Sequence, residues 1–329
     1  MRAAATDVLV RTRSVPCDFP VRRRDGSLAL NPVCAFATNA GVYDCAWSET
    51  HPHQLLSACA DGSIKLWDVV ASASSGRPLA AWTEHSAEVQ GVDWNLVGKE
   101  TFATASWDGT VRVWAPERPS ALLTLAEHTH SVYEARWAPR HVSRLLSASG
   151  DGTARLWDPV AGSASVLTLR TGPAELLSLD WSKYDENYFA VGSVDHSIST
   201  WDVRAPHSPV STLQGHTSAV RRVRYCPHRP ALLLSASYDM GVCLWDESAP
   251  NPLCRRYDHH TEFVAGADFS LFQEAGLASV GWDGQLYVWM QDAQTAPPRP
   301  PVPGPAPGEP IAAPPPGTSA GPAGGGGAS

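Results

Sequence analysis

The sequence predicts an all-β protein, a propeller of seven blades whose first blade is short and degenerate. The prediction rests on a repeated unit, on its fixed period and on its common ending. The unit is clearest at 215–246, where two β-rich runs, a tight turn at 238–241 and a third β-rich run ending in Trp245-Asp246 follow one another. The same pattern recurs at 41–68, 84–115, 127–158, 171–202 and 259–290.

The spacing of the repeats identifies the kind of propeller. Each unit has an aspartate in its turn and a tryptophan at the end of its third run, and both series advance by 47, 43, 44, 44 and 44 residues. The turn aspartates are Asp61, Asp108, Asp151, Asp195, Asp239 and Asp283, and the tryptophans are Trp67, Trp114, Trp157, Trp201, Trp245 and Trp289. This period, with Trp-Asp closing four units, resembles the WD40 repeat, in which each unit forms a four-stranded blade.

A four-stranded blade with alternating apolar residues needs a neighbour on each side to bury both faces, so the repeats should close into a ring. The resemblance implies a buried network in each blade, in which a histidine before the first strand meets the turn aspartate, a Ser or Thr hydroxyl and the tryptophan indole. The predicted structural sets are His85, Asp108 and Trp114; His128, Asp151 and Trp157; His216, Asp239 and Trp245; and His260, Asp283 and Trp289. The unit at 171–202 has Gly172-Pro173 in place of the histidine, so Asp195 should lack an imidazole partner.

The chain is expected to contain one propeller domain and one tail. Residues 1–40 are predicted to form the degenerate first blade, with 7–10 as a strand that closes the ring on the last blade; a basic arm or transit peptide is the alternative reading of their arginines. Residues 41–291 hold the six clear repeats. Residues 292–329 are rich in Pro, Gly and Ala, which predicts a disordered tail. No apolar run is long enough for a signal peptide or a membrane span, so a soluble protein is expected.

Composition narrows the function classes. A net charge of −8 argues against nucleic acid or an anionic membrane as the main partner and leaves basic peptides open. The seven cysteines include no C-x-x-C pair, and the histidine clusters lack carboxylate or cysteine companions at ligand spacing, so neither a metal nor a cofactor is expected. No phosphate-binding loop or nucleophile motif is present, and Ser, His and Asp recur with the repeat, as an active site would not. We therefore expect a binding protein and not an enzyme.

Binding on a propeller is expected where the loops before the first strands and the aspartate turns form one rim. Positions counted from the repeat histidine place acidic and aromatic residues there. The predicted peptide-binding residues are Glu88, Glu134, Glu175, Glu262, Trp107, Tyr238 and Trp282. Carboxylates together with aromatic anchors suit a basic amphipathic peptide. The alternative for each residue is a solvated charge or a packing aromatic.

Several segments are more specific than a generic blade. They include the runs Trp181-Ser-Lys-Tyr184 and His259-His-Thr-Glu-Phe263. The segments 84–95, 147–158, 178–204, 215–239 and 259–270 are similar to the WD40-class peroxisomal import receptor for the type-2 targeting signal. That resemblance covers roughly 42–289, and the short opening and the Pro/Gly tail depart from it.

The resemblance implies a receptor that binds, in the cytosol, the amphipathic N-terminal type-2 signal of matrix enzymes such as thiolase. It also implies a co-receptor, a docking complex at the peroxisome and cycling between cytosol and peroxisome, without direct membrane insertion. Glu88 and Glu175 are then expected to pair with the basic end of the signal. Two alternatives stay open: Trp201-Asp202-Val203-Arg204 fits the ending of substrate adaptors of cullin-type ubiquitin ligases, and the repeat alone is consistent with a generic scaffold.

Overall fold

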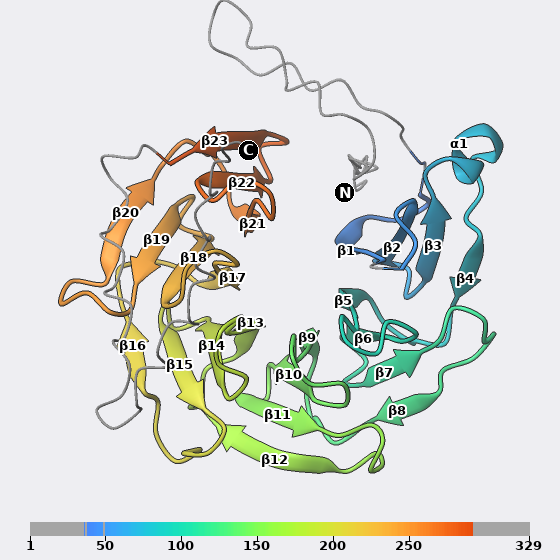
Figure 1. Ribbon diagram of the computed structural model, residues 1–329, viewed down its shortest axis with the longest axis horizontal. Helices are drawn as coiled ribbons and strands as arrows, with labels where there is room; N and C mark the ends of the chain where they lie inside the picture. Colours follow the sequence, from blue (N-terminus) through green and yellow to red (C-terminus); the bar gives the residue numbers. More distant parts are fainter. Residues whose placement is uncertain (1–35, 37, 49, 292–329) are drawn as a thin grey trace, which may run out of the picture. The chain divides into compact units, whose positions relative to one another are not determined.

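The computed structural model describes residues 36, 38–48 and 50–291, which form six antiparallel sheets around a common axis (Figure 1). In each sheet the strands pair in chain order, and the first strand of each lies innermost (Figure 1). We number the sheets as blades 1 to 6 in chain order. The all-β WD40 propeller architecture predicted from the repeats is confirmed.

The strands follow the repeats closely. Blade 1 comprises β1 (Val42–Trp47), β2 (Gln54–Cys59), β3 (Ile64–Asp68) and β4 (Ala80–Trp82), with α1 (Ala71–Ser75) before β4. Blade 2 comprises β5 (Val89–Trp94), β6 (Phe102–Ser106), β7 (Val111–Trp114) and β8 (Leu123–Leu125). Blade 3 comprises β9 (Val132–Trp137), β10 (Leu145–Ser149), β11 (Thr153–Trp157) and β12 (Ser165–Arg170).

The second half of the domain repeats this order. Blade 4 comprises β13 (Leu176–Trp181), β14 (Tyr188–Ser193), β15 (Ile198–Asp202) and β16 (Ser211–Leu213). Blade 5 comprises β17 (Val220–Tyr225), β18 (Leu232–Ser237), β19 (Val242–Asp246) and β20 (Leu253–Tyr257). Blade 6 has three strands in the described part of the chain: β21 (Val264–Phe269), β22 (Gly276–Gly281) and β23 (Leu286–Met290).

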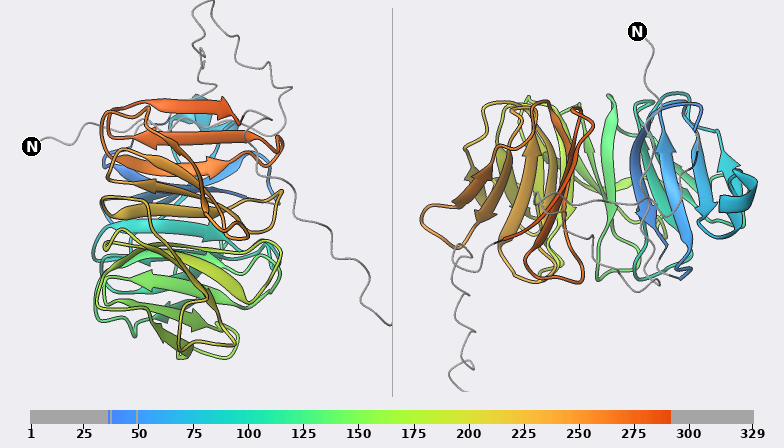
Figure 2. Two further views of the ribbon diagram at one scale, coloured as in Figure 1. Left: turned by 90° about the vertical axis from the view of Figure 1, so that its left-hand side faces the viewer. Right: turned by 90° about the horizontal axis from the view of Figure 1, so that it is seen from above.

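Neighbouring blades share their apolar cores, and successive sheets stack face to face (Figure 2). Between blades 3 and 4, Leu146 and Ala148 of β10 pack with Leu179 of β13 and Phe189 of β14, all fully buried. Equivalent apolar layers join blades 1 and 2, 2 and 3, 4 and 5, and 5 and 6. Burial between blades, rather than within one, therefore holds the domain together.

A β-bulge recurs at the same place in every blade. In blade 5, Val220 pairs with Ser237 and Arg222 pairs with Ala236, which leaves Arg221 as an extra residue in β17. The equivalent extra residues are Tyr43, Gln90, Tyr133, Leu177, Arg221 and Ala265. A bulge re-aims a side chain and increases the local twist. Each blade therefore presents one side chain with a distinct direction at the start of its innermost strand.

The described residues form six blades, where seven were predicted. The stretch assigned to the short first blade, 1–40, lies almost entirely outside the described residues, as does the predicted tail at 292–329. The two blades at the ends of the series are less covered than the others: Val288 and Met290 of β23 are 37% and 51% exposed, whereas Val242 and Leu244 at the corresponding strand of blade 5 are fully buried. No helix in the described ranges is long and apolar enough to cross a membrane.

Candidate functional site

A hydrogen-bonded chain of side chains links the strands of blade 2. The indole N–H of Trp114 donates to Thr104 Oγ1 at 2.9 Å, Thr104 Oγ1 lies 2.8 Å from His85 Nε2, and His85 Nδ1 lies 2.8 Å from Asp108 Oδ2. The indole can only donate, so the threonine hydroxyl oxygen accepts from it. Both ring nitrogens of His85 thus have a hydrogen-bond partner, and the network joins the loop before β5 to strands β6 and β7.

The same chain recurs in blades 3 and 5, with a serine in place of the threonine. Its members are His128, Asp151, Ser147 and Trp157 in blade 3, and His216, Asp239, Ser235 and Trp245 in blade 5. The histidine, serine and tryptophan of each chain are buried. Their hydrogen bonds therefore hold the loop before the first strand against the turn. These side chains therefore fix the conformation of the rim and are not available to contact a ligand.

Blades 4 and 6 depart from this pattern. In blade 4 Asp195 accepts from the backbone and hydroxyl of Ser197, at 3.0 and 2.6 Å, and Trp201 donates instead to Ser199. In blade 6 His260 meets Asp283 and Ser279, but the indole N–H of Trp289 has no hydrogen-bond partner among the described residues. The set predicted for blade 6 is therefore assembled without its tryptophan.

The turn aspartates of the complete networks have carboxyl pKa values below the ordinary range. Burial by itself would raise the pKa of Asp151, but hydrogen bonds from His128, Thr153 and Thr129 outweigh it and hold the pKa well below its ordinary value. The pKa values of Asp108 and Asp239 are lowered in the same way. A carboxylate whose folded pKa is depressed contributes stability that is present above its unfolded pKa and is lost as the pH falls through the folded pKa.

Replacing Asp151 by asparagine is therefore expected to lower the free energy of unfolding by about 1–3 kcal/mol at pH 7, because charge-assisted hydrogen bonds to the buried His128 are lost. The difference from the unmodified protein should stay constant down to about pH 4 and narrow in stronger acid. Urea unfolding at a series of pH values measures both the loss of free energy at pH 7 and its dependence on pH. A difference that instead grew as the pH fell would contradict the assignment.

The rim brings most of the predicted binding residues onto one end of the blades. Glu88 and Glu175 are half-buried and Glu262 is exposed; Trp107 and Trp282 are 40% and 66% exposed. The backbone carbonyl of Glu88 accepts from the N–H of Trp107, and that of Glu175 accepts from the N–H of Val194, each at 3.0 Å. Each glutamate loop is therefore tied to the aspartate turn beside it.

Aromatic rings at the rim gather in two groups. In the first, Tyr43, Trp107 and Tyr133 come from blades 1, 2 and 3, with ring centroids 6.4 and 6.2 Å apart. In the second, Tyr238, Phe263 and Trp282 come from blades 5 and 6, with centroids 5.0 to 6.3 Å apart. Such pairs bury apolar area, while Tyr43, Trp107 and Trp282 remain 41%, 40% and 66% exposed. The rim thus offers two partly exposed aromatic platforms.

Three of these rings, Tyr43, Tyr133 and Phe263, were missed by sequence reasoning. Tyr43 and Tyr133 occupy the bulge position, and Phe263 directly precedes the first strand of its blade. Aligning the repeats at the second residue of each innermost strand would have found the two tyrosines. Tyr133 also donates to Glu175 at 3.0 Å; burial, and then the nearby carboxylate, raise its pKa to about 12.

Glu134 does not fit the rim set. Its side chain is fully buried in β9 and contacts the guanidinium groups of Arg136, Arg222 and Arg224 at 2.8, 2.8 and 3.0 Å. Its second oxygen accepts from the backbone N–H of Leu179 at 3.1 Å. A carboxylate with every oxygen engaged by the protein has no capacity for a peptide, so Glu134 is a structural residue beneath the rim.

The buried charges around Glu134 form a layer that joins blades across the axis. Arg136 of blade 3 also pairs with Asp93 of blade 2 at 2.8 Å and with Asp44 of blade 1 at 3.4 Å. Arg222 of blade 5 reaches the same Asp44 at 3.4 Å. Opposite charges with several hydrogen bonds each satisfy one another in this setting. The layer links blade 1 to blades 3 and 5 and supports the rim from below.

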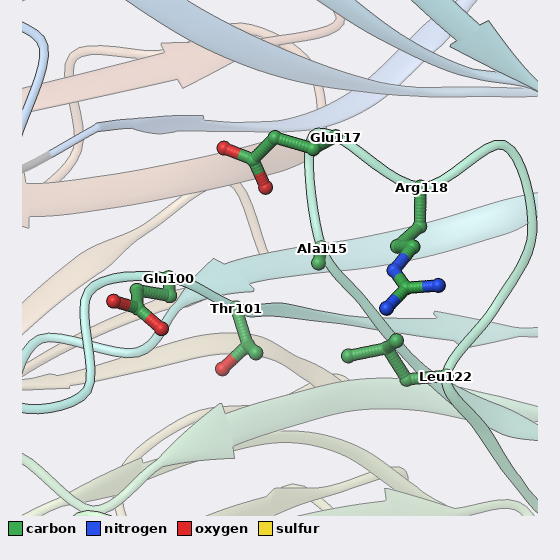
Figure 3. Close-up of a pocket in the computed structure, with 6 residues that line it drawn as sticks. All are labelled: Glu100, Thr101, Ala115, Glu117, Arg118 and Leu122. Carbon is green, nitrogen blue, oxygen red and sulfur yellow. The ribbon is translucent and has the colours of Figure 1, made fainter.

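A cavity of about 470 Å³ lies in blade 2, away from the rim (Figure 3). Its lining residues precede β6 or follow β7, at the ends of these strands opposite to the aspartate turn. They are Glu100, Thr101, Ala115, Glu117, Arg118 and Leu122. None of the predicted binding residues lines this cavity, and its side chains show no catalytic or metal-binding arrangement.

Comparison with known proteins supports the class that the fold defines. The model of the WD domain, G-beta repeat, matches residues 31–68, 76–115, 120–158 and 207–246. With the six observed blades, this match supports a WD40-repeat β-propeller fold.

The relatives named as peroxisomal targeting signal 2 receptors confirm the resemblance seen in the sequence. The receptor of Dictyostelium discoideum is 51% identical over 81 residues, 25% of each chain. The receptor of Homo sapiens is 39% identical over 106 residues, 32% of each chain, and that of Saccharomyces cerevisiae is 30% identical over 203 residues, 53% of each chain. The aligned parts thus span about a quarter to about half of these relatives. Their names describe receptors.

Proposed function

We propose that this protein is a receptor for the type-2 peroxisomal targeting signal. It binds the signal of cargo proteins such as thiolase in the cytosol, delivers them with a co-receptor to the docking complex of the peroxisome, and cycles between the two compartments. The names of its relatives and the similarity of the quoted segments support this proposal. The structural observation that carries it is the rim, where two half-buried glutamates lie beside partly exposed aromatic rings.

The two glutamates are suited to a basic side chain. Glu88 lies in the loop before β5 on blade 2, and Glu175 in the loop before β13 on blade 4, so they lie at equivalent positions two blades apart. One oxygen of Glu175 accepts from Tyr133, which orients the carboxylate and leaves the other oxygen for a ligand. Glu262, at the corresponding loop of blade 6, adds a further negative charge to the rim. An acidic rim of this kind also speeds the encounter with a basic peptide.

Reversing both charges, Glu88→Arg with Glu175→Arg, is expected to weaken binding of a labelled type-2 targeting peptide by about tenfold or more, because attraction is replaced by repulsion. Fluorescence anisotropy with the purified protein at two salt concentrations measures this. Binding to the unmodified protein should also weaken as salt rises.

The matched control reverses two charges in the cavity of blade 2, Glu100→Arg with Glu117→Arg, which alters net charge equally but away from the rim (Figure 3). It should leave peptide affinity within about twofold. If both double variants bound alike, the assignment of Glu88 and Glu175 would be wrong. If the folded, unmodified protein bound no peptide with or without co-receptor, the receptor proposal itself would fail.

The ubiquitin-ligase adaptor is a second candidate, favoured by the position of one side chain. Arg204 is 61% exposed and is held by Asp202 through contacts of 2.6 to 3.1 Å, so it projects from the end of β15 in a fixed orientation. An adaptor would present such a group to the ligase's large propeller subunit. Co-purification with that subunit, abolished by Arg204→Ala, would favour this role.

A further inference from the structure

The centre of the rim contains a buried cation without a counter-ion. Arg221, the bulge residue of blade 5, is 8% exposed. Its guanidinium lies 3.3 Å from Gln90 Oε1 of blade 2 and 3.4 Å from the carbonyl oxygen of Leu177 in blade 4. Both acceptors are themselves bulge residues. The Arg221 side chain therefore reaches across the central axis, at the level where the innermost strands begin.

These two contacts are long and neutral. Among the described residues no carboxylate lies within 4.0 Å of Arg221, whereas the other two arginines of β17, Arg222 and Arg224, pair with Glu134. A guanidinium has five N–H donors, so two weak acceptors leave most of them unused. Burying a charge without a paired opposite charge is costly. The protein carries this cost at the centre of its candidate binding surface.

Gln90 adds a second unsatisfied donor at the same place. Its side chain is 3% exposed, and its Oε1 accepts from Arg221. The Nε2 group of the same amide is buried and has no hydrogen-bond partner in the described part of the chain. A buried amide donor without a partner again costs free energy in the unliganded protein. The Arg221 guanidinium and the Gln90 amide could therefore both donate to one acceptor group of a ligand.

The surroundings favour an acceptor that arrives from the rim side. Below Arg221, the acidic groups Asp44, Asp93 and Glu134 are committed to Arg136 and Arg222. At the same level, Tyr43 and Tyr133 of the first aromatic group occupy the equivalent bulge position in blades 1 and 3. An anion that reaches Arg221 would be largely removed from water, where a charge-assisted hydrogen bond is strong.

We propose that Arg221 and Gln90 form a carboxylate-binding subsite at the centre of the rim, which takes an acidic side chain of the bound peptide. The inference rests on the proposed function, since it assumes that a peptide binds across the rim. The peptide then carries a basic residue for the glutamates of the rim and an acidic residue, on the face that meets the protein, for Arg221. The site would select among basic amphipathic peptides by the presence and position of that carboxylate.

A scan of the ligand tests this subsite. In a labelled type-2 targeting peptide, each residue in turn is replaced by Glu and, in a parallel set, by Gln. At one peptide position, or at two positions one helical turn apart, the Glu peptide should bind the unmodified protein about tenfold more tightly than the Gln peptide. Elsewhere Glu should bind equally or more weakly, because the rim is acidic.

Variants of the protein then test whether Arg221 and Gln90 cause the preference for Glu. Arg221→Met removes the charge and keeps the length of the side chain, and it should abolish the preference for Glu over Gln at that position; Gln90→Leu should reduce it. The matched control, Arg170→Met on the exposed outer strand β12, should leave it unchanged. Circular dichroism and thermal unfolding of each variant establish that it is folded.

The outcomes are distinct. If the parent peptide binds but no position prefers Glu, or if the preference persists in Arg221→Met, the carboxylate subsite is refuted while the receptor proposal stands. If the parent peptide does not bind the folded protein, the receptor proposal fails, and the subsite as an element of peptide binding fails with it. A preference lost in Arg221→Met and kept in Arg170→Met supports the subsite.

Discussion

Replacing Glu134 by alanine is expected to lower the free energy of unfolding by about 3–5 kcal/mol. The carboxylate is fully buried and is shared by Arg136, Arg222 and Arg224. Removing it leaves three guanidinium groups with fewer partners in the interior, and it removes the acceptor of the Leu179 backbone N–H. Since the layer joins blades 3, 4 and 5, the loss should be felt by the whole domain. Urea unfolding followed by tryptophan fluorescence measures it.

The matched control is Glu262→Ala on the exposed rim, which removes the same group and should change the free energy of unfolding by less than about 0.5 kcal/mol. Burial would raise the pKa of Glu134, but the charges of Arg224, Arg222 and Arg136 outweigh it and hold the pKa well below its ordinary value. Its contribution is therefore present at neutral pH and is lost only as the pH falls through that low value. Equal effects of the two alanine variants would show that the buried layer contributes nothing.

The repeats made most of the fold predictable. The aspartate turns and the strand-end tryptophans mark the second and third strands of each blade, because these positions are dictated by the hydrogen-bonded chain seen at His85, Thr104, Asp108 and Trp114. A histidine at a fixed distance before the turn indicated which loops lie on the rim. Local pattern and tertiary contact agree in these blades, which is why the sequence alone predicted their strands and their order.

The positions of single side chains on the innermost strand were less predictable. Glu134 directly follows the bulge residue Tyr133, and the bulge changes which side of β9 each side chain faces. Counting from His128 placed Glu134 on the rim, whereas the structure turns it into the buried charge layer and gives the rim Tyr133 instead. The three arginines that satisfy Glu134 lie up to 90 residues away, and no local pattern reveals such pairing.

Blade 6 shows a second limit of the repeat argument. His260 and Asp283 meet as the pattern predicts, yet Trp289 lies outside the network, and His259 Nε2 also lies 3.1 Å from Ser279 Oγ. Trp289 contacts the rings of Tyr257 and His259 instead. The repeat specifies which residue types occur at each position, but it does not specify that the last tryptophan packs against Tyr257 and His259.

The second large effect is expected at the second aromatic group. Trp282→Ser should weaken binding of the labelled type-2 targeting peptide by about 30-fold or more, because exposed tryptophans at the centre of an interface are frequent anchors and their truncation costs about 2 kcal/mol or more. Trp282 is 66% exposed and rests against Phe263 and Tyr238, with centroids 5.4 and 6.3 Å away. Its indole is thus pre-positioned by two rings while most of its surface is free to contact a ligand.

The control for this variant is Phe272→Ser. Phe272 is 74% exposed but lies in the connection between β21 and β22, at the end of blade 6 opposite to the rim, so the change removes a comparable aromatic surface from the other end of the same blade. Peptide affinity should then stay within about twofold. Both positions are largely exposed, and neither substitution should change the free energy of unfolding by much more than about 0.5 kcal/mol. An affinity loss shared by the two variants would point to a disturbed blade 6; a loss confined to Trp282→Ser identifies the ring as an anchor for the apolar face of the peptide.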